Sequence, residues 1–104
     1  MLTILRRRIF VNEVLDIAER LGRADPQAGQ RFIDACEDTF NQLADMPRLG
    51  SPREFNHPNL RNVGMWRVKG YEKYLIFYQA ARTTLRLLHL VHGARDYKTL
   101  FESE

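Results

Sequence analysis

The sequence of 104 residues predicts a single α+β domain. We expect a short N-terminal strand, an antiparallel two-helix hairpin, and then a three-stranded antiparallel meander, with the strands forming one sheet (β-α-α-β-β-β). Apolar residues recur three and four positions apart between residues 14 and 43, which is the period of amphipathic helices. Runs of β-branched and aromatic residues follow between residues 63 and 91 and are typical of strands. The length suits one hydrophobic core, so we assign residues 1–104 to one domain.

The N-terminal part is expected to contain the first strand and the first helix. Residues 2–5 form a short apolar run that we interpret as the strand. Asn12 is the expected cap of the helix, and Gly22 is its expected end. The apolar face of this helix is formed by Val14, Ile17, Ala18 and Leu21.

The second helix has the clearest start in the sequence. Asp25 followed by Pro26 is typical of a helix N-terminus, because aspartate caps the first turn and proline fits the first helical position. Pro47 marks the end of this helix. Only a few residues separate the two helices, so we expect them to be antiparallel. The apolar face of the second helix contains Ala28, Phe32, Ala35, Cys36, Thr39, Phe40 and Leu43.

After the second helix the pattern becomes extended. Residues 47–59 contain prolines and a glycine and are predicted as a loop. Three strands are expected to follow, with tight turns between them, at residues 63–68, 74–78 and 85–91. The last two strands are nearly all apolar, which is typical of central strands covered on at least one face. Residues 97–104 either add a short helix or continue without regular structure.

The net charge of +3 is unevenly distributed along the chain. Residues 1–24 carry +2, residues 25–46 carry −4, and residues 47–104 carry +5. A basic half attracts nucleic acid or an acidic protein, although a solvated surface without a partner explains it equally well. The single cysteine favours a reducing compartment. The N-terminus lacks the pattern of a signal peptide, and no apolar run is long enough for a membrane span, so we expect a cytoplasmic protein without membrane contact.

Several kinds of chemistry are excluded by residue type and spacing. His89 and His92 are three positions apart in a strand and therefore point to opposite faces, so we predict no metal site. Cys36 lies on the apolar face of a helix and is interpreted as a core residue rather than a nucleophile. The six glycines are scattered and form no phosphate-binding loop. We expect no cofactor.

Cationic and aromatic residues of the strand half remain as candidates for binding. Such residues hold a phosphate backbone and stack on bases, while the alternative is that Trp66 belongs to the core and the charges solubilise the sheet rim. The segment from His92 to Tyr97 follows the last strand, where side chains emerge at a sheet end. The full set is Arg61, Trp66, Arg67, Lys69, Lys73, Arg86, His92, Arg95 and Tyr97.

The chain resembles the ParE/RelE superfamily of toxins, and its ParE-like (plasmid stabilisation) subgroup in particular, over nearly its whole length. The resemblance rests on several short patterns in a fixed order. These are Pro26-x-Ala28-x-x-x-Phe32, Leu43-x-x-Met46-Pro47-x-x-Gly50-x-Pro52, Leu60-Arg61, Gly70-Tyr71-x-x-Tyr74-Leu75-Ile76-Phe77-Tyr78 and Val91-His92-Gly93-Ala94-Arg95-Asp96.

The resemblance implies the toxin of a type II toxin–antitoxin pair, neutralised by a cognate antitoxin (ParD-like or similar). ParE-like members are associated with DNA gyrase, and RelE-like members with cleavage of mRNA on the ribosome; the shared fold does not choose between them. We expect target binding by Arg61, Trp66, Arg67, Lys69, His92 and Arg95.

If the chain is a metal-independent ribonuclease, similarity implies Arg67 and Arg95 as cationic groups and His92 or Tyr97 as proton carriers. Phe101 stands where a late proton-carrying aromatic is expected, and a phenyl ring carries no proton. This incomplete set favours gyrase inhibition over an enzyme. A non-toxic module that only binds a partner is a further alternative.

Overall fold

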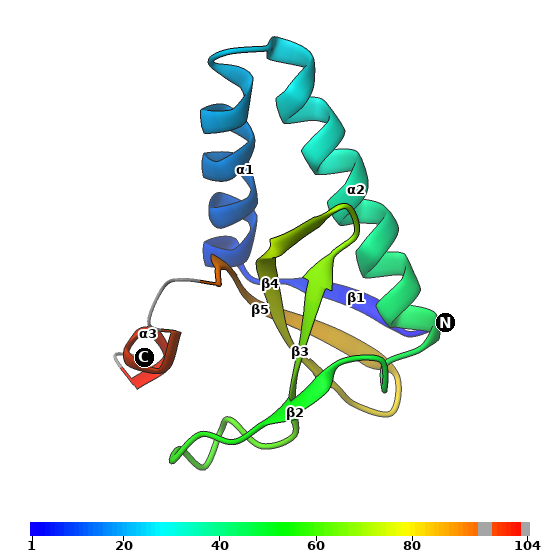
Figure 1. Cartoon of the computed structure of the whole chain (residues 1–104). Coiled ribbons are helices and arrows are strands. Elements are labelled where there is room, and N and C mark those ends of the chain that lie inside the picture. Colours follow the sequence, from blue (N-terminus) through cyan, green and yellow to red (C-terminus); the bar gives the residue numbers. More distant parts are fainter. Residues whose placement is uncertain (94–96, 103–104) are drawn as a thin grey trace.

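The fold is described from a computed structural model that covers residues 1–93 and 97–102 (Figure 1). Two helices stand on one face of a five-stranded sheet, and a short third helix lies on the other side. The elements in chain order are β1 (Thr3–Arg6), α1 (Arg8–Gly22), α2 (Pro26–Asp45), β2 (Ser51–Arg53), β3 (Val63–Val68), β4 (Tyr71–Ala80), β5 (Thr84–His92) and α3 (Tyr97–Glu102). The predicted α+β order is confirmed, and α3 is the short C-terminal helix.

The sheet has the order β1-β5-β4-β3-β2. The meander of β3, β4 and β5 is antiparallel as predicted, but the whole sheet is mixed, because β1 pairs with β5 in parallel. The long connection through both helices permits this parallel pairing. The predicted loop over residues 47–59 contains the additional strand β2, which pairs with the first half of β3. Pro52 fits there because β2 is an edge strand.

The two long helices differ in how well the sequence located their starts. The start of α2 is confirmed: the side chain of Asp25 accepts a hydrogen bond from the Gln27 amide at 3.1 Å, and Pro26 is the first helical residue. The predicted cap of α1 is wrong, because this helix already begins at Arg8 and Asn12 lies inside it. Arg7 is at the cap position and makes no side-chain cap bond. No helix within residues 1–93 and 97–102 combines the length and apolar character of a membrane span.

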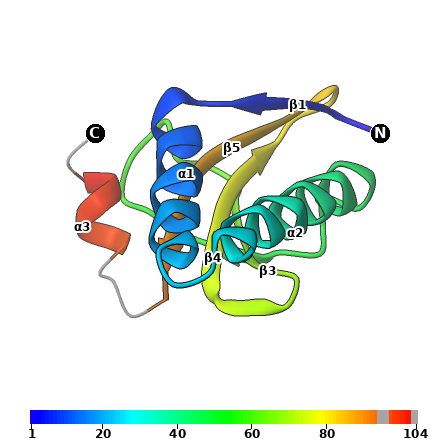
Figure 2. The same cartoon turned by 90° about the horizontal axis from the view of Figure 1, so that it is seen from above.

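The helices pack closely near their connection and diverge toward the sheet (Figures 1 and 2). At the close end, Gly29 of α2 lies against the backbone of Ala18 of α1. The main core fills the space between the helices and one face of the sheet, which we call the helix face. It contains the predicted apolar side of α2, including Phe32, Phe40 and Leu43.

A second core lies on the opposite face of the sheet, which we call the α3 face. Phe101 of α3 is fully buried there, and its ring packs against Phe77 of β4 and Phe55 of the loop after β2. A bulge leaves Leu88 without a partner opposite β4, and this residue also enters the second core. Because both faces are covered, the continuous run of buried residues in β5 is explained.

Candidate target-binding surface

Three of the expected target-binding residues surround one cleft beside the hairpin of β3 and β4. Trp66, Arg67 and Lys69 line this cleft of about 520 Å³, together with residues of α2. The guanidinium carbon of Arg67 lies 4.8 Å from the centroid of the Trp66 ring, within the range of a cation–π contact. Asp38 and Glu72 also line the cleft and balance the two positive charges. The cleft is therefore an amphipathic surface rather than a strongly basic one.

The tip of this hairpin is fixed to α2 by a buried hydroxyl. The backbone N–H of Lys69 donates to Oγ1 of Thr39 at 3.0 Å, and this hydroxyl donates to the carbonyl of Ala35 at 2.7 Å. Thr39 is almost fully buried, so an unpaired hydroxyl there would be costly. The bond holds the Lys69 side chain beside the cleft while leaving it exposed.

His92 lies at the end of β5, at the same end of the sheet as the hairpin. Its side chain is exposed, and its ring meets the Tyr74 ring edge-on with 5.4 Å between centroids. It borders a small cleft whose other walls include the carboxylates of Glu13 and Asp16. Arg20 also lines this cleft, so its charged walls hold two carboxylates and one guanidinium among the described residues, and they offer no excess of positive charge for a phosphate backbone.

The two remaining candidates of the C-terminal segment are Arg95 and Tyr97. Arg95 lies outside the described residues. Tyr97 opens α3, and its ring packs against Phe77 at 4.8 Å and Phe55 at 6.2 Å between centroids. Its ring is therefore part of the packing on the α3 face.

The sheet register places the expected ribonuclease residues on different faces. Arg67 stands opposite Leu75, whereas His92 stands opposite Tyr74. Directly opposite residues share a face, and successive residues of a strand alternate. Leu75 packs in the second core and Tyr74 against the main core. The strand positions of Arg67 and His92 thus face opposite sides of the sheet, but the Arg67 guanidinium reaches the Trp66 ring and the hairpin cleft, which His92 does not line.

Arg61 is separated from the other candidates. It precedes β3, whereas Trp66, Arg67 and Lys69 lie at the far end of that strand. Six residues of extended chain span about 20 Å, so Arg61 and Arg67 do not form one binding cluster. The expected set is divided between the hairpin cleft, the end of β5 and the start of β3.

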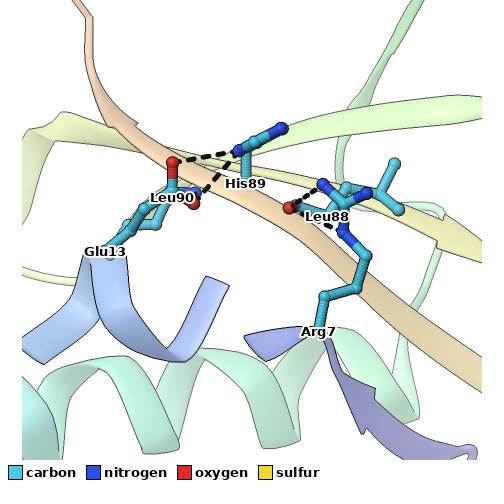
Figure 3. Close-up of polar contacts among 5 residues, drawn as sticks. All are labelled: Arg7, Glu13, Leu88, His89 and Leu90. Atoms are coloured by element: carbon cyan, nitrogen blue, oxygen red, sulfur yellow. Dashed lines mark hydrogen bonds and ion pairs between the residues drawn. The ribbon is translucent and has the colours of Figure 1, made fainter. Parts of the chain in front are cut away.

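A polar cluster that the sequence did not predict closes the free edge of β5 (Figure 3). Pairing with β1 ends where Arg6 stands opposite Leu87, so the next backbone groups of β5 have no strand partner on that side. The guanidinium of Arg7 donates to the Leu88 carbonyl at 2.6 and 3.2 Å. The carboxylate of Glu13 accepts from the Leu90 N–H at 3.1 Å. Side chains at the start of α1 therefore replace the missing strand.

His89 completes this cluster from within the protein. Its ring is fully buried, and Nδ1 lies 3.0 and 3.1 Å from the two carboxylate oxygens of Glu13. Because a carboxylate only accepts, Nδ1 carries the proton. On its other side the ring meets the buried Phe101 edge-on. His89 therefore joins α1, β5 and α3, and its burial keeps it from acting on a substrate.

Cys36 is the second buried group with nucleophilic chemistry. It is completely buried in the main core, as predicted. Burial raises the pKa of its thiol to about 12, so the thiol stays protonated at neutral pH. A protonated, inaccessible thiol is no nucleophile.

Comparisons with known proteins agree with this architecture. A family model described as "ParE toxin of type II toxin-antitoxin system, parDE" matches residues 4–97. A solved structure described as "Chromosomal ParDE TA system from P. aeruginosa" is similar with a TM-score of 0.58 and 12% sequence identity, over 88% of this chain and 96% of that chain. At this identity the likeness concerns the fold alone. A comparison with curated proteins gives no match.

Proposed function

The chain belongs to the ParE toxin family of type II toxin–antitoxin systems, and from this premise we propose that it inhibits DNA gyrase and is neutralised by a cognate, ParD-like antitoxin. The observation that carries the proposal is the family match, which extends from β1 to the first residue of α3. Gyrase as target implies action in the cytoplasm, and the proposal requires no cofactor.

The arrangement of the candidate residues supports inhibition by binding over catalysis. General acid–base cleavage of RNA needs a base, an acid and a cation within hydrogen-bond reach of one phosphate. Arg67 lines the hairpin cleft and His92 a different one, and the Tyr97 ring is packed against Phe77. By contrast, Trp66, Arg67 and Lys69 around one cleft form a surface for protein recognition, since tryptophan and arginine are typical of interface centres.

Exposed apolar residues of α1 support binding of an antitoxin. Val11 and Leu15 are 37% and 51% exposed and are one helical turn apart, outside the buried face of the helix. Ile9 is also largely exposed. A partner helix that covers apolar residues at this spacing is a common mode of recognition. We propose that the antitoxin covers this side of α1.

A supercoiling assay tests the proposed target. Purified protein added to gyrase, relaxed plasmid and ATP should block supercoiling and cause linear DNA to accumulate when the reaction is stopped with denaturant. A variant with Arg67→Ala and Lys69→Ala should inhibit less, because both side chains line the hairpin cleft. Arg23→Ala, in the connection between α1 and α2 and outside the lining of the hairpin cleft, serves as the control. Full supercoiling at micromolar protein would contradict gyrase as target.

The two alternatives have their own readouts. A ribosome-dependent ribonuclease would cut translated mRNA inside codons, which primer extension detects, and Arg95→Ala should abolish those cuts. A module that only binds a partner would leave growth unaffected when expressed without antitoxin. Growth arrest with intact mRNA and a DNA-damage response would contradict both alternatives and agree with gyrase inhibition.

A further inference from the structure

A large cleft lies at the end of the sheet opposite the hairpin. It has a volume of about 1030 Å³ and is formed by the segment after α2, the loop between β2 and β3, and the ends of β3 and β4. Three arginines line it: Arg48, Arg53 and Arg61. We call it the arginine cleft. Of the expected target-binding residues that the structure describes, Arg61 alone belongs to it, and the hairpin cleft shares none of its lining.

Both walls of the arginine cleft are fixed by successive residues of β4. The hydroxyl of Tyr78 donates to the Pro47 carbonyl at 2.6 Å and accepts from the Gly50 N–H at 2.9 Å. The amide of Gln79 donates to the carbonyls of Asn59 and Arg61 at 3.1 and 2.8 Å. The segment after α2 and the loop before β3 are thus both tied to β4, and the cleft is preformed. A preformed site spends less binding free energy on ordering itself.

The Tyr78 ring is tightly packed between two glycines that also line the cleft. Gly50 and Gly64 both lie against its ring, and a Cβ atom at either position would come within 3 Å of ring atoms. Only glycine therefore allows the segment after α2 and strand β3 to approach the ring this closely. Burial raises the pKa of the Tyr78 hydroxyl, so it remains a hydrogen-bond donor at neutral pH.

The charge of the cleft is unbalanced. Among the residues that the structure describes, its lining contains three arginines and a single carboxylate, that of Glu54. Within the described residues, none of the three guanidinium groups forms a salt bridge; Arg53 donates to the neighbouring Pro52 carbonyl. Apolar residues, among them Pro52 and Leu60, also line the cleft. The lining of the cleft thus combines cations with apolar residues.

We propose that the arginine cleft is a second binding site, which takes an acidic peptide segment with an apolar side chain between its carboxylates. Guanidinium groups pair with carboxylates through two parallel hydrogen bonds, and the apolar residues of the lining suit the apolar side chain. This site goes beyond the proposed function, because it lies at the other end of the sheet from the hairpin cleft and does not depend on gyrase being the target.

The lining favours a peptide over a nucleic acid. Bases bind single-strand sites by stacking on exposed aromatic rings. The two aromatic residues of this cleft are engaged elsewhere: Tyr78 is buried, and the Phe55 ring packs against Phe101 at 4.5 Å between centroids. The other uncharged walls include prolines and aliphatic side chains, which suit an extended peptide.

The test uses a fluorescein-labelled peptide in which a leucine stands between pairs of glutamates, titrated with the purified full-length chain and followed by anisotropy. We expect saturable binding that weakens with salt. Replacing the glutamates of the peptide by glutamines should weaken binding about tenfold, because the charge-assisted hydrogen bonds are lost. This comparison uses only the unmodified protein, so it does not depend on any variant folding.

A variant with Arg48→Glu and Arg53→Glu should bind the acidic peptide at least about tenfold more weakly. The matched control, Arg8→Glu with Arg23→Glu, makes the same change in net charge at the two ends of α1, outside the lining of the cleft, and should change the affinity less than about twofold. If both variants lose the same amount of peptide affinity, overall charge explains the binding, and the proposal is overturned. Tighter binding of a single-stranded RNA oligonucleotide of equal charge, lost in the first variant, would also overturn it.

The gyrase assay on the same proteins separates this inference from the proposed function. The variant with Arg48→Glu and Arg53→Glu should inhibit gyrase as the unmodified chain does, since neither residue lines the hairpin cleft. If the unmodified chain binds the peptide but neither it nor any variant inhibits gyrase, only the gyrase proposal is contradicted. If the unmodified chain inhibits gyrase but does not bind the peptide, only the proposal for the arginine cleft is contradicted.

Discussion

An alanine at position 29 is expected to force the two long helices apart. A Cβ atom at Gly29 would lie 2.5 Å from the carbonyl oxygen of Ala18 and 3.3 Å from its carbonyl carbon. Both are backbone atoms of α1, so no side-chain rotation relieves the overlap. Non-bonded carbon and oxygen atoms rest roughly 3.3–3.6 Å apart, and one helix must therefore move by about 1 Å.

The size of the effect follows from two opposing contributions. Overpacking of this kind costs about 1–3 kcal/mol, and we take the upper end because the atoms in contact are backbone. Replacing glycine by alanine inside a helix stabilises it by about 1 kcal/mol. The net expectation for Gly29→Ala is a loss of about 2 kcal/mol in the free energy of unfolding. For a domain of this length the loss corresponds to a Tm lower by roughly 8 °C.

The measurement is urea unfolding followed by far-ultraviolet circular dichroism, with a thermal scan beside it. The midpoint of Gly29→Ala should fall by about 1 M urea with an unchanged slope. Gly22→Ala is the matched control, since its Cβ atom would approach other atoms no closer than 4.0 Å. That variant should keep the original stability or gain up to about 1 kcal/mol. Gly29→Ala as stable as the original chain would refute the close helix contact.

Three further predictions concern groups that hold the structure together. Tyr78→Phe should lower the free energy of unfolding by about 1–3 kcal/mol, because it leaves the partly buried Pro47 carbonyl and Gly50 N–H without their partner. Tyr74→Phe should have little effect, and equal stability of both variants in thermal scans would contradict this role of Tyr78. Glu13→Ala should lower the free energy of unfolding by about 2–3 kcal/mol, because the bonds to His89 and Leu90 are lost. Glu13→Gln should lower it less, since glutamine keeps one acceptor oxygen. A loss of stability no larger than that of Asp16→Ala, at an exposed residue, would argue against the cluster. Burial raises the pKa of the Cys36 thiol to about 12, so its protonation favours the folded chain fully below about pH 9 and this stabilisation is lost as the pH rises toward 12. Urea midpoints between these pH values should fall more steeply for the original chain than for Cys36→Ala, and parallel curves would be the contrary result.

The sequence located the elements whose signals are local. The helical spacing and the Asp25-Pro26 start predicted α2, and the run from Val63 to Val68 predicted β3 with the bounds that the structure has. The start of α1 was missed because Arg7 carries no local cap signal: its side chain bonds to Leu88, far away in the sequence. Strand β2 was missed because three residues with a proline show no strand pattern of their own.

The candidate site was predicted less completely, because it depends on which residues a register brings together. The basic residues between positions 61 and 73 were expected to form one surface, yet Arg61 lies before one end of β3 and Lys69 beyond the other. Arg48 and Arg53 join Arg61 in the arginine cleft only because Tyr78 and Gln79 tie two loops to β4. No spacing within the sequence predicts such a grouping.

The amino-acid sequence by itself determined the α+β class, the helix hairpin, the meander and the resemblance to ParE-like toxins, because each rests on short-range periodicity or on residues in a fixed order. Only the tertiary structure decided that β1 runs parallel to β5, that Glu13 binds His89, and that the basic residues divide between two clefts. These contacts join residues tens of positions apart. Their partners are selected by how the helices and the sheet bury their apolar faces together, and that packing is a property of the whole chain.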